Sequence, residues 1–302
     1  MCRKAKVMAK EKIPVYDICS LKKDQYQQND FSMERFGAYL KKHYQNLQLP
    51  HRHSFYHLVL FAKGAGKHSI DFTNFAVKPM QAYFMAPGQV HSWHFEGEVD
   101  GYIINFSEQL FRSFLLNPGY LESFPFFRGD SNESVCQLPP EIHNKVLQLL
   151  EEMLAIFDSG DESQLDMVCV LLLQFFMAVN NTATQNKGEK IPQQKLQLLN
   201  SLRRLIDQHY LNLRLPKEYA DLLYITPNHL NALCQDLIGK TAGELIRDRV
   251  LLEAKRLLTN AGMSATEIAY ALNFQDNSYF NRFFKKYAGV TPDDFRKQFA
   301  AG

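Results

Sequence analysis

The sequence has few cysteines, and their spacing excludes the sites that cysteines commonly build. There are five, an odd number, and no two of them form a C-x-x-C pair: Cys2, Cys19, Cys136, Cys169 and Cys234. Disulfide frameworks and cysteine zinc sites need paired or clustered cysteines. The sequence therefore predicts neither, and it favours a reducing compartment.

Long hydrophobic runs are also missing. The start, MCRKAKVMAKEKIP, has charges but no apolar stretch behind them, which argues against a secretory signal or a lipid anchor at Cys2. The longest apolar run, MVCVLLLQFFMAV from Met167, is interrupted by Gln174 and is shorter than the roughly 18 residues that a membrane helix needs. We therefore expect a soluble, cytoplasmic protein with no membrane contact.

The chain also has little excess of either charge, because its 302 residues carry a net charge of only +2. The balance is uneven along the chain: from residue 192 onward there are 15 Lys and Arg against 11 Asp and Glu, a surplus of four. A basic C-terminal third is a weak indication of nucleic-acid binding, since a solvated helical surface can carry the same charge. The length allows two domains, and 46% hydrophobic residues are typical of folded ones.

Short strands are predicted up to about Asn105, where apolar and polar residues alternate between glycines and prolines such as Gly64, Pro79 and Gly88. Two helices follow, marked by apolar residues at helical spacing from Ile142 to Phe157 and from Leu165 to Val179. The second helix is apolar on nearly all sides. Either the pair packs only on its own β domain, or it also contacts a second subunit, with Leu150 and Met153 as candidates for that interface.

A repeat lies in the C-terminal third. The stretch NFQDNSYFNRFFKKYAGVTP, residues 273–292, is echoed about fifty residues earlier by YITPNHLNALCQDLIGKTAGEL. In each copy four apolar residues stand at i, i+3, i+4 and i+7: Leu230, Leu233, Cys234 and Leu237, then Phe280, Phe283, Phe284 and Tyr287. Thr226 and Pro227 are expected to begin the first helix and Asp276 or Asn277 to cap the second, while Gly239 and Gly289 suit the helix ends. Each copy therefore predicts a helix, a tight turn and a helix.

A helix-turn-helix presents the outer face of its second helix to the DNA major groove. The candidate DNA-binding residues are those on the two outer faces: Asn228, His229, Asn231 and Gln235 in the first copy, and Ser278, Tyr279, Asn281, Arg282, Lys285 and Lys286 in the second. The first face has only amide and imidazole groups and is expected to favour adenine. In the second, Arg282 suits guanine and the lysines suit phosphate. A plain helical bundle would show one such solvated face, but two in-phase copies argue against it.

The run EAKRLLTNAGMSATEIAYALNFQDNSYFNRFFKKYAGVTPDDFRK closely resembles the signature of the AraC/XylS family of bacterial transcription regulators, over about residues 194–299. The matching positions are Arg256, Leu257, Leu258, Ile268, Ala269, Phe274, Tyr279, Phe280, Phe283, Phe284, Gly289, Thr291 and Pro292. The resemblance implies two helix-turn-helix units joined by a helix, which bind promoter DNA and usually activate transcription with RNA polymerase. We expect a multi-domain fold: residues 1–181 for sensing and dimerisation, 182–193 as a polar linker, and 194–302 as an all-α DNA-binding domain.

The stretch LPHRHSFYHLVLFAKGAGKHSIDFTNFAVKPMQAYFMAPGQVHSW looks like the cupin-type β-barrel that often precedes this DNA-binding module. Alternation places His51, His53 and His57 on one face, expected to be the interior. The residues His53, His57, Tyr83, His91 and Trp93 are expected either to line a pocket for a small-molecule effector or to pack as core. A metal-binding cupin has a glutamate where His57 stands, so no metal or other cofactor is predicted.

The leading hypothesis is a DNA-binding transcription activator, homodimeric, that responds to a small-molecule effector and is not an enzyme. The alternative is a metal-dependent cupin enzyme fused to a DNA-binding module, and the sequence offers no Asp or Glu beside the histidines to support it. A regulator that needs no ligand is a third possibility.

Overall fold

The computed structural model describes residues 14–18, 30–111, 115, 120–185, 192–259 and 262–300. The described residues between Pro14 and Lys190 form one compact unit, here the β unit, and those from Ile191 onward form a second, the helical unit. Half of the expected linker at 182–193, residues 186–191, lies outside the described residues; residues 182–185 belong to a helix that ends at Gln185, and the next helix begins at Gln193. The expectation for the N-terminal segment with Cys2 also lies outside them.

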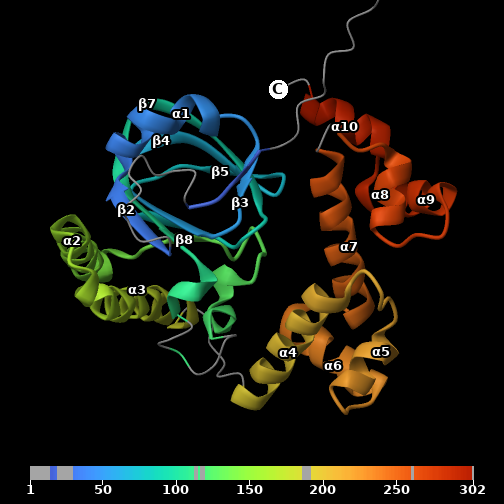
Figure 1. Ribbon diagram of the computed structural model, residues 1–302. Coiled ribbons are helices and arrows are strands. Elements are labelled where there is room, and N and C mark those ends of the chain that lie inside the picture. The colour runs from blue at the N-terminus through green and yellow to red at the C-terminus, as the bar shows by residue number, and fades with distance from the viewer. Residues whose placement is uncertain are drawn as a thin grey trace, which may run out of the picture. The chain divides into compact units, whose positions relative to one another are not determined.

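Within the described residues the β unit has one curved sheet of eight strands (Figure 1). The strands are β1 Val15–Tyr16, β2 Phe31–Arg35, β3 His51–His53, β4 Tyr56–Ile70, β5 Thr73–Ala76, β6 Gln81–Met85, β7 Val90–Phe106 and β8 Val135–Gln137. They pair in the order β1-β3-β7-β4-β6-β8, with β2 also on β7 and β5 also on β4. The two long strands β4 and β7 pair antiparallel along their length and so organise the sheet.

The sheet has two apolar faces. Along β4, Leu58 and Leu60 are buried on the outer face, whereas Val59 and Phe61 are buried on the inner face with Trp93. This is the period-2 alternation of a pleated strand. Each of these strands therefore contributes to both cores. Every second residue faces the interior, and the residues between them face the helices.

The alternation changes where β4 bends. The register with β7 shifts between Phe61 and Ala65, and beyond the shift Ile70 lies on the inner face although its numbering has the opposite parity to Phe61. On the partner strand, a Cβ at Gly101 would lie 1.9 Å from the carbonyl oxygen of Leu60, so only glycine allows the two backbones to approach this closely. The β-bulges thus turn the last part of β4 over.

Three helices accompany the sheet: α1 Phe36–Leu47, α2 His143–Ser159 and α3 Leu165–Gln185. Helix α1 was not expected, because only strands were predicted before Asn105. Its apolar residues Phe36, Tyr39 and Leu40 follow helical spacing and pack into the inner core. The segments around it alternate apolar and polar residues with period 2, and this pattern hides a single helix between strands.

Helices α2 and α3 pack against the outer face of the sheet in the largest core of the β unit. Leu150 and Met153 are fully buried there, so their expected place at a subunit interface is wrong. The window Leu165–Thr182 of α3 is long and apolar enough to span a membrane, contrary to the expectation from the run at Met167. However, 44% of this window is buried inside the β unit, as in the core helix of a folded domain.

Helices α4 to α10 make up the helical unit (Figure 1). They are α4 Gln193–His209, α5 Pro216–Leu222, α6 Pro227–Ile238, α7 Ala242–Leu258, α8 Ala265–Ala271, α9 Asn277–Ala288 and α10 Pro292–Ala300. Helix α7 joins the two predicted repeats, α5–α6 and α8–α9. With 17 residues it is about 25 Å long.

The two repeats share their turn geometry. In the first turn the N–H of Ile225 donates to the carbonyl of Ala220 at 3.0 Å, and in the second the N–H of Phe274 donates to Ala269 at 2.9 Å. The residue before each, Tyr224 or Asn273, is left-handed with φ of 55° or 58°. The same hydrogen bonds and the same backbone twist close both turns, so the internal repeat predicted from the sequence is a structural repeat.

Candidate nucleic-acid interface and histidine site

The second helix of each repeat begins at a side-chain cap. The Thr226 hydroxyl accepts a hydrogen bond from the His229 N–H at 3.2 Å, and the Asp276 carboxylate accepts one from the Tyr279 N–H at 2.6 Å. The cap of α9 is therefore Asp276, one of the two predicted residues. Such caps satisfy first-turn N–H groups that would otherwise lack partners, and they fix where each helix starts.

Most of the predicted DNA-binding residues are exposed on one side of α6 and α9. The exposed ones are Asn228, His229 and Gln235 on α6, and Ser278, Tyr279, Arg282, Lys285 and Lys286 on α9. The opposite sides are buried, by Leu230, Leu233 and Cys234 in α6 and by Phe280 and Phe284 in α9. Tyr287 departs from the predicted stripe, because it is 40% exposed.

The two remaining candidates, Asn231 and Asn281, occupy equivalent positions but have different surroundings. Both are half-buried. The Asn231 side-chain oxygen accepts a hydrogen bond from the Ala242 N–H at 3.1 Å, at the start of α7. At the same place in the second repeat stands Pro292, which has no N–H. Asn231 therefore has a structural role that Asn281 cannot share.

The charges of the two faces differ as well. Helix α6 contains no Lys or Arg, and its Asp236 is paired with Lys195 at 2.6 Å. Among the ion pairs of the described residues, none involves Arg282, Lys285 or Lys286. Helix α9 thus presents positive charge that no carboxylate neutralises.

A groove of about 1100 Å³ lies between α9, α7 and the start of α5. Four cationic side chains line it: Arg214, Arg247, Arg282 and Lys286. The Arg247 guanidinium lies 5.3 Å from the centre of the Tyr287 ring, a cation–π contact. Sequence analysis missed Arg214 and Arg247, because they belong to the loop before α5 and to α7 rather than to the repeat's outer faces.

Arg214 and Asn273 also connect the two repeats. The Arg214 guanidinium donates to the carbonyl of Leu272, in the second turn, and lies over the Phe274 ring at 5.2 Å. Asn273 donates to the carbonyl of Leu211 at 3.2 Å. Burial lowers the pKa of Arg214, but an arginine stays charged at any physiological pH. These contacts restrain α6 and α9 relative to each other.

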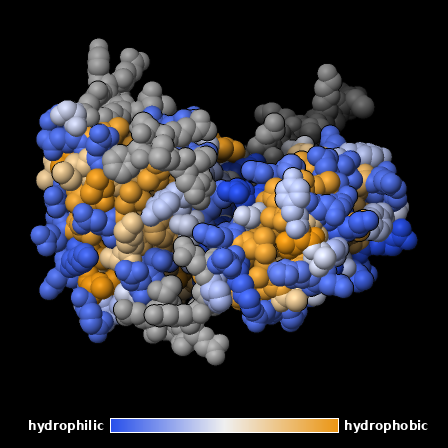
Figure 2. Space-filling model, turned by 90° about the horizontal axis from the view of Figure 1, so that it is seen from below, coloured by the Kyte–Doolittle hydropathy of each residue, from blue (hydrophilic) through white to orange (hydrophobic). Residues whose placement is uncertain are grey.

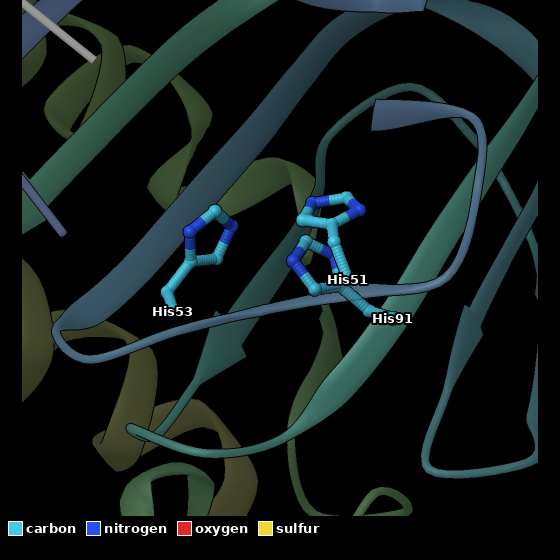
Figure 3. Close-up of side chains that lie close together, drawn as sticks. All are labelled: His51, His53 and His91. Atoms are coloured by element: carbon cyan, nitrogen blue, oxygen red, sulfur yellow. The ribbon is translucent and has the colours of Figure 1, made fainter. Parts of the chain in front are cut away.

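The second candidate site is a cluster of five buried histidines inside the β unit. His51 and His53 come from β3, His57 and His68 from β4, and His91 from β7, all at most 3% exposed. Figure 3 shows the rings of His51 and His91 one above the other, with the His53 ring next to them. Nitrogens of these three lie within 4.8 Å of one another. The ring centres of His51 and His91 are 4.1 Å apart, and those of His53 and His57 are 4.6 Å apart.

Hydrogen bonds orient three of the rings. His51 Nδ1–H donates to the carbonyl of Leu49 at 2.8 Å. His57 Nδ1 and the Asn105 oxygen are 2.6 Å apart, and the Asn105 amide nitrogen donates to Ser32, so the histidine is the donor. His91 Nδ1 is 3.1 Å from His68 Nε2. In each case Nδ1 is engaged and Nε2 is directed elsewhere.

All five imidazoles are neutral at physiological pH. Burial lowers the pKa of His51 to about 4 and the pKa of His57 to about 3. Burial, with repulsion from the neighbouring histidines, also holds the pKa of His53, His68 and His91 well below the ordinary value. Neutral imidazoles keep a lone pair on one nitrogen, so the cluster can accept a hydrogen bond or bind a metal ion.

The predicted ligand-binding residues are brought together, but away from solvent. Trp93 lies against His57, with ring centres 5.5 Å apart, and is 1% exposed. Tyr83 is buried and donates to the Gln81 side chain at 2.7 Å. Sequence analysis missed His68, because strict alternation from His57 places it outside. The register shift in β4 turns His68 inward. The glycines in AKGAGK are the sequence feature that could have indicated this β-bulge.

Two family models match the chain. The AraC-like ligand binding domain matches residues 38–173, and the helix-turn-helix domain matches residues 219–298. The transcriptional regulator YijO of Escherichia coli K12 is 25% identical over 57% of this chain and 59% of its own length, so the chain spans less than two thirds of that relative. The transcriptional activator RhaR of Mannheimia succiniciproducens is 21% identical over 86% of this chain and 91% of its own. The crystal structure of ToxT from Vibrio cholerae O395 is similar over 89% of this chain and 98% of its own, with 16% identity and a TM-score of 0.45.

The histidine cluster makes the β unit sensitive to acid. Because the folded pKa values lie below the ordinary 6.5, the unfolded chain binds more protons as the pH falls from 6.5 toward 4, and stability is lost in that range. Lowering the pH from 7.5 to 5.5 should cost about 1 kcal/mol each for His51 and His57, and the lowered pKa values of His53, His68 and His91 act in the same direction. Trp93 is the single tryptophan, so its fluorescence in urea titrations of metal-free protein reports this unit. Equal urea midpoints at the two pH values would contradict the expectation.

The equivalent asparagines should separate stability from recognition. Asn231→Ala leaves the Ala242 N–H without its partner and should lower the free energy of unfolding by about 1 kcal/mol. Asn281→Ala should change it by less than about 0.5 kcal/mol, because Pro292 has no N–H to lose. Circular dichroism during thermal unfolding measures both. Equal destabilisation by the two variants would show that the cap is unimportant.

Proposed function

Because the chain belongs to the AraC family of transcription regulators, with an AraC-like ligand-binding domain followed by a helix-turn-helix DNA-binding domain, we propose that it is an activator controlled by a small effector bound inside the β unit. The family is one of regulators and not of enzymes, so the cupin-enzyme alternative is not retained. In domain terms, we propose residues 1–181 for sensing and dimerisation and 194–302 for DNA binding. The cytoplasm is the expected location.

The observation that carries the DNA-binding proposal is the pair of capped, exposed helices α6 and α9, held by matching turns at the two ends of α7. The length of α7, about 25 Å, suits two helices that enter successive major-groove segments about 34 Å apart. Arg214 and Asn273 restrain this spacing. The groove with four cations lies beside α9, where a phosphate backbone would pass.

The two helices are proposed to contribute differently. Helix α9 supplies most of the electrostatic affinity through unpaired Lys285 and Lys286, and Arg282 reads guanine. Helix α6 reads its segment through Asn228, His229 and Gln235, which carry no full charge. Asn231 does not read a base in this proposal, because its side chain caps the start of α7. Asn281 remains a candidate for a base contact.

Dimerisation is proposed through the outer side of α2 and α3. On α3, Met167 and Met177 are 49% and 45% exposed, and Leu154 of α2 and Leu173 of α3 are only partly buried against the core. Figure 2 shows hydrophobic residues gathered on the underside of the β unit, where Figure 1 places these helices. Exposed apolar groups of this kind mark interaction surfaces. An activator is expected to have RNA polymerase as a further partner. The relative RhaR is likewise named a transcriptional activator.

The division of labour on α9 is tested with full-length protein and a library of DNA sites at two salt concentrations. Arg282→Ala should weaken binding by roughly 1–3 kcal/mol and relax the preference at one base pair. Lys285→Ala should weaken all sequences alike and reduce the salt dependence by about one phosphate. If both variants gave the same base preferences and salt slopes, the assignment would be wrong, and if wild-type protein bound no DNA, the proposed function itself would fail.

The dimer surface is tested by sedimentation velocity. The double variant Met167→Asp and Met177→Asp should shift the protein toward monomer without unfolding it, because both side chains are exposed. Asn74→Asp adds the same kind of charge at an exposed position on β5 and is the control. An unchanged dimer in the double variant would place the interface elsewhere. Leu150 and Met153 are unsuitable because a buried charge there would unfold the unit.

A further inference from the structure

Several histidine nitrogens in the β unit are buried and have no hydrogen-bond partner among the described residues. There are six: His51 Nε2, His53 Nδ1 and Nε2, His57 Nε2, His68 Nδ1 and His91 Nε2. Three of the rings neighbour the fourth, since the centres of His51, His57 and His53 lie 4.1, 5.3 and 4.9 Å from that of His91. Simple packing does not account for such an arrangement, because apolar rings would fill the same space without leaving polar atoms unsatisfied.

The hydrogen bonds around the cluster have the form found around metal-binding histidines. A ligating imidazole usually donates its other N–H to a carbonyl or a side chain, which fixes the ring and its tautomer. Here Nδ1 of His51 donates to Leu49, Nδ1 of His57 donates to Asn105, and Nδ1 of His91 contacts His68. The Nε2 atoms of the same three rings are the unpartnered ones. Two second partners, Leu49 and Asn105, are thus in place on the nitrogen that a metal would not use, and His68 is the third when it accepts from His91 Nδ1–H.

The distances are close to those of a metal site. The ligand nitrogens of His51, His53 and His91 lie within 4.8 Å of one another. Four nitrogens bound tetrahedrally at about 2.1 Å would be about 3.4 Å apart. Side-chain movements of about an ångström would therefore bring these three residues to ligand spacing, and His57 would have to join them as the fourth.

We propose that the β unit binds one first-row divalent transition-metal ion through Nε2 of His51, His57 and His91 and a ring nitrogen of His53, and that this ion is its effector. The second half of this statement rests on the proposed regulatory function. An all-imidazole set suits zinc, copper, nickel, cobalt or iron and disfavours magnesium and calcium, which prefer oxygen. His68 holds His91 in orientation and is not a ligand.

The proposed ion has a means to act as an effector. It would draw together rings that belong to three strands, β3, β4 and β7. These strands are neighbours in the sheet, and the other strands of the unit pair with them or extend the same sheet. Metal-free and metal-bound forms therefore differ in the strands that meet at the site. A ligand changes an equilibrium only if it binds two forms unequally, and this contraction provides the difference.

Untagged full-length protein, freed of metal with a chelator, is titrated with Co²⁺ and then with Zn²⁺ in competition, and bound metal is counted after equilibrium dialysis. The expected result is one ion per chain, with Mg²⁺ unable to compete. His53→Phe and His91→Phe keep aromatic bulk in the core and should weaken metal binding at least about tenfold. The control is His94→Phe, because His94 is exposed on the same strand as His91. Thermal unfolding should show that zinc raises the melting temperature of wild type but not of the two core variants.

The results separate the two levels of the proposal. Absent saturable binding, or equal binding in wild type and a folded His53→Phe/His91→Phe variant, would overturn the metal site. Metal binding with no change in affinity for promoter DNA between metal-free and metal-bound protein would overturn its role as effector. Failure to bind DNA in either form would instead count against the regulatory function, while the metal titration would still test the site.

Discussion

The free-energy cost of burying imidazole nitrogens without partners is the constraint on which the β unit depends. An unsatisfied buried polar atom costs about 1–3 kcal/mol, and six imidazole nitrogens have no partner among the described residues. A whole domain is stable by only about 5–15 kcal/mol. An ion bound as proposed would give four of these six nitrogens a partner and so would offset part of the cost.

The same reasoning about unsatisfied groups explains why the two repeats of the helical unit are not interchangeable. Both second helices have a side-chain cap and both turns close with the same hydrogen bonds. In the first repeat, the start of α7 needs an acceptor for the Ala242 N–H, and Asn231 provides it. In the second, Pro292 removes that need and leaves Asn281 for other contacts. A proline at one helix start thus decides which asparagine has this structural role.

Local signals made much of this predictable. The repeat at a spacing of fifty residues, the caps and the helix-ending glycines appear in the sequence itself, and alternation correctly placed His51, His53 and His57 in the interior. What was missed depends on contacts between distant segments. His68 faces inward only because a bulge opposite Gly101 reverses the alternation, Arg214 matters only because it reaches Leu272, and Leu150 is buried only because α2 lies on the sheet. No local pattern contains that information.

His51, His53, His57 and His91 are proposed as metal ligands and not as core packing, and this is the central claim. X-ray absorption at the zinc edge of zinc-loaded, full-length protein tests it most directly, because it identifies the atoms bound to the ion. The claim predicts a first shell of nitrogen at about 2.0–2.1 Å with the outer-shell signature of several imidazoles. A first shell dominated by sulfur at about 2.3 Å, or by oxygen without imidazole scattering, would contradict it by placing the ion elsewhere on the chain.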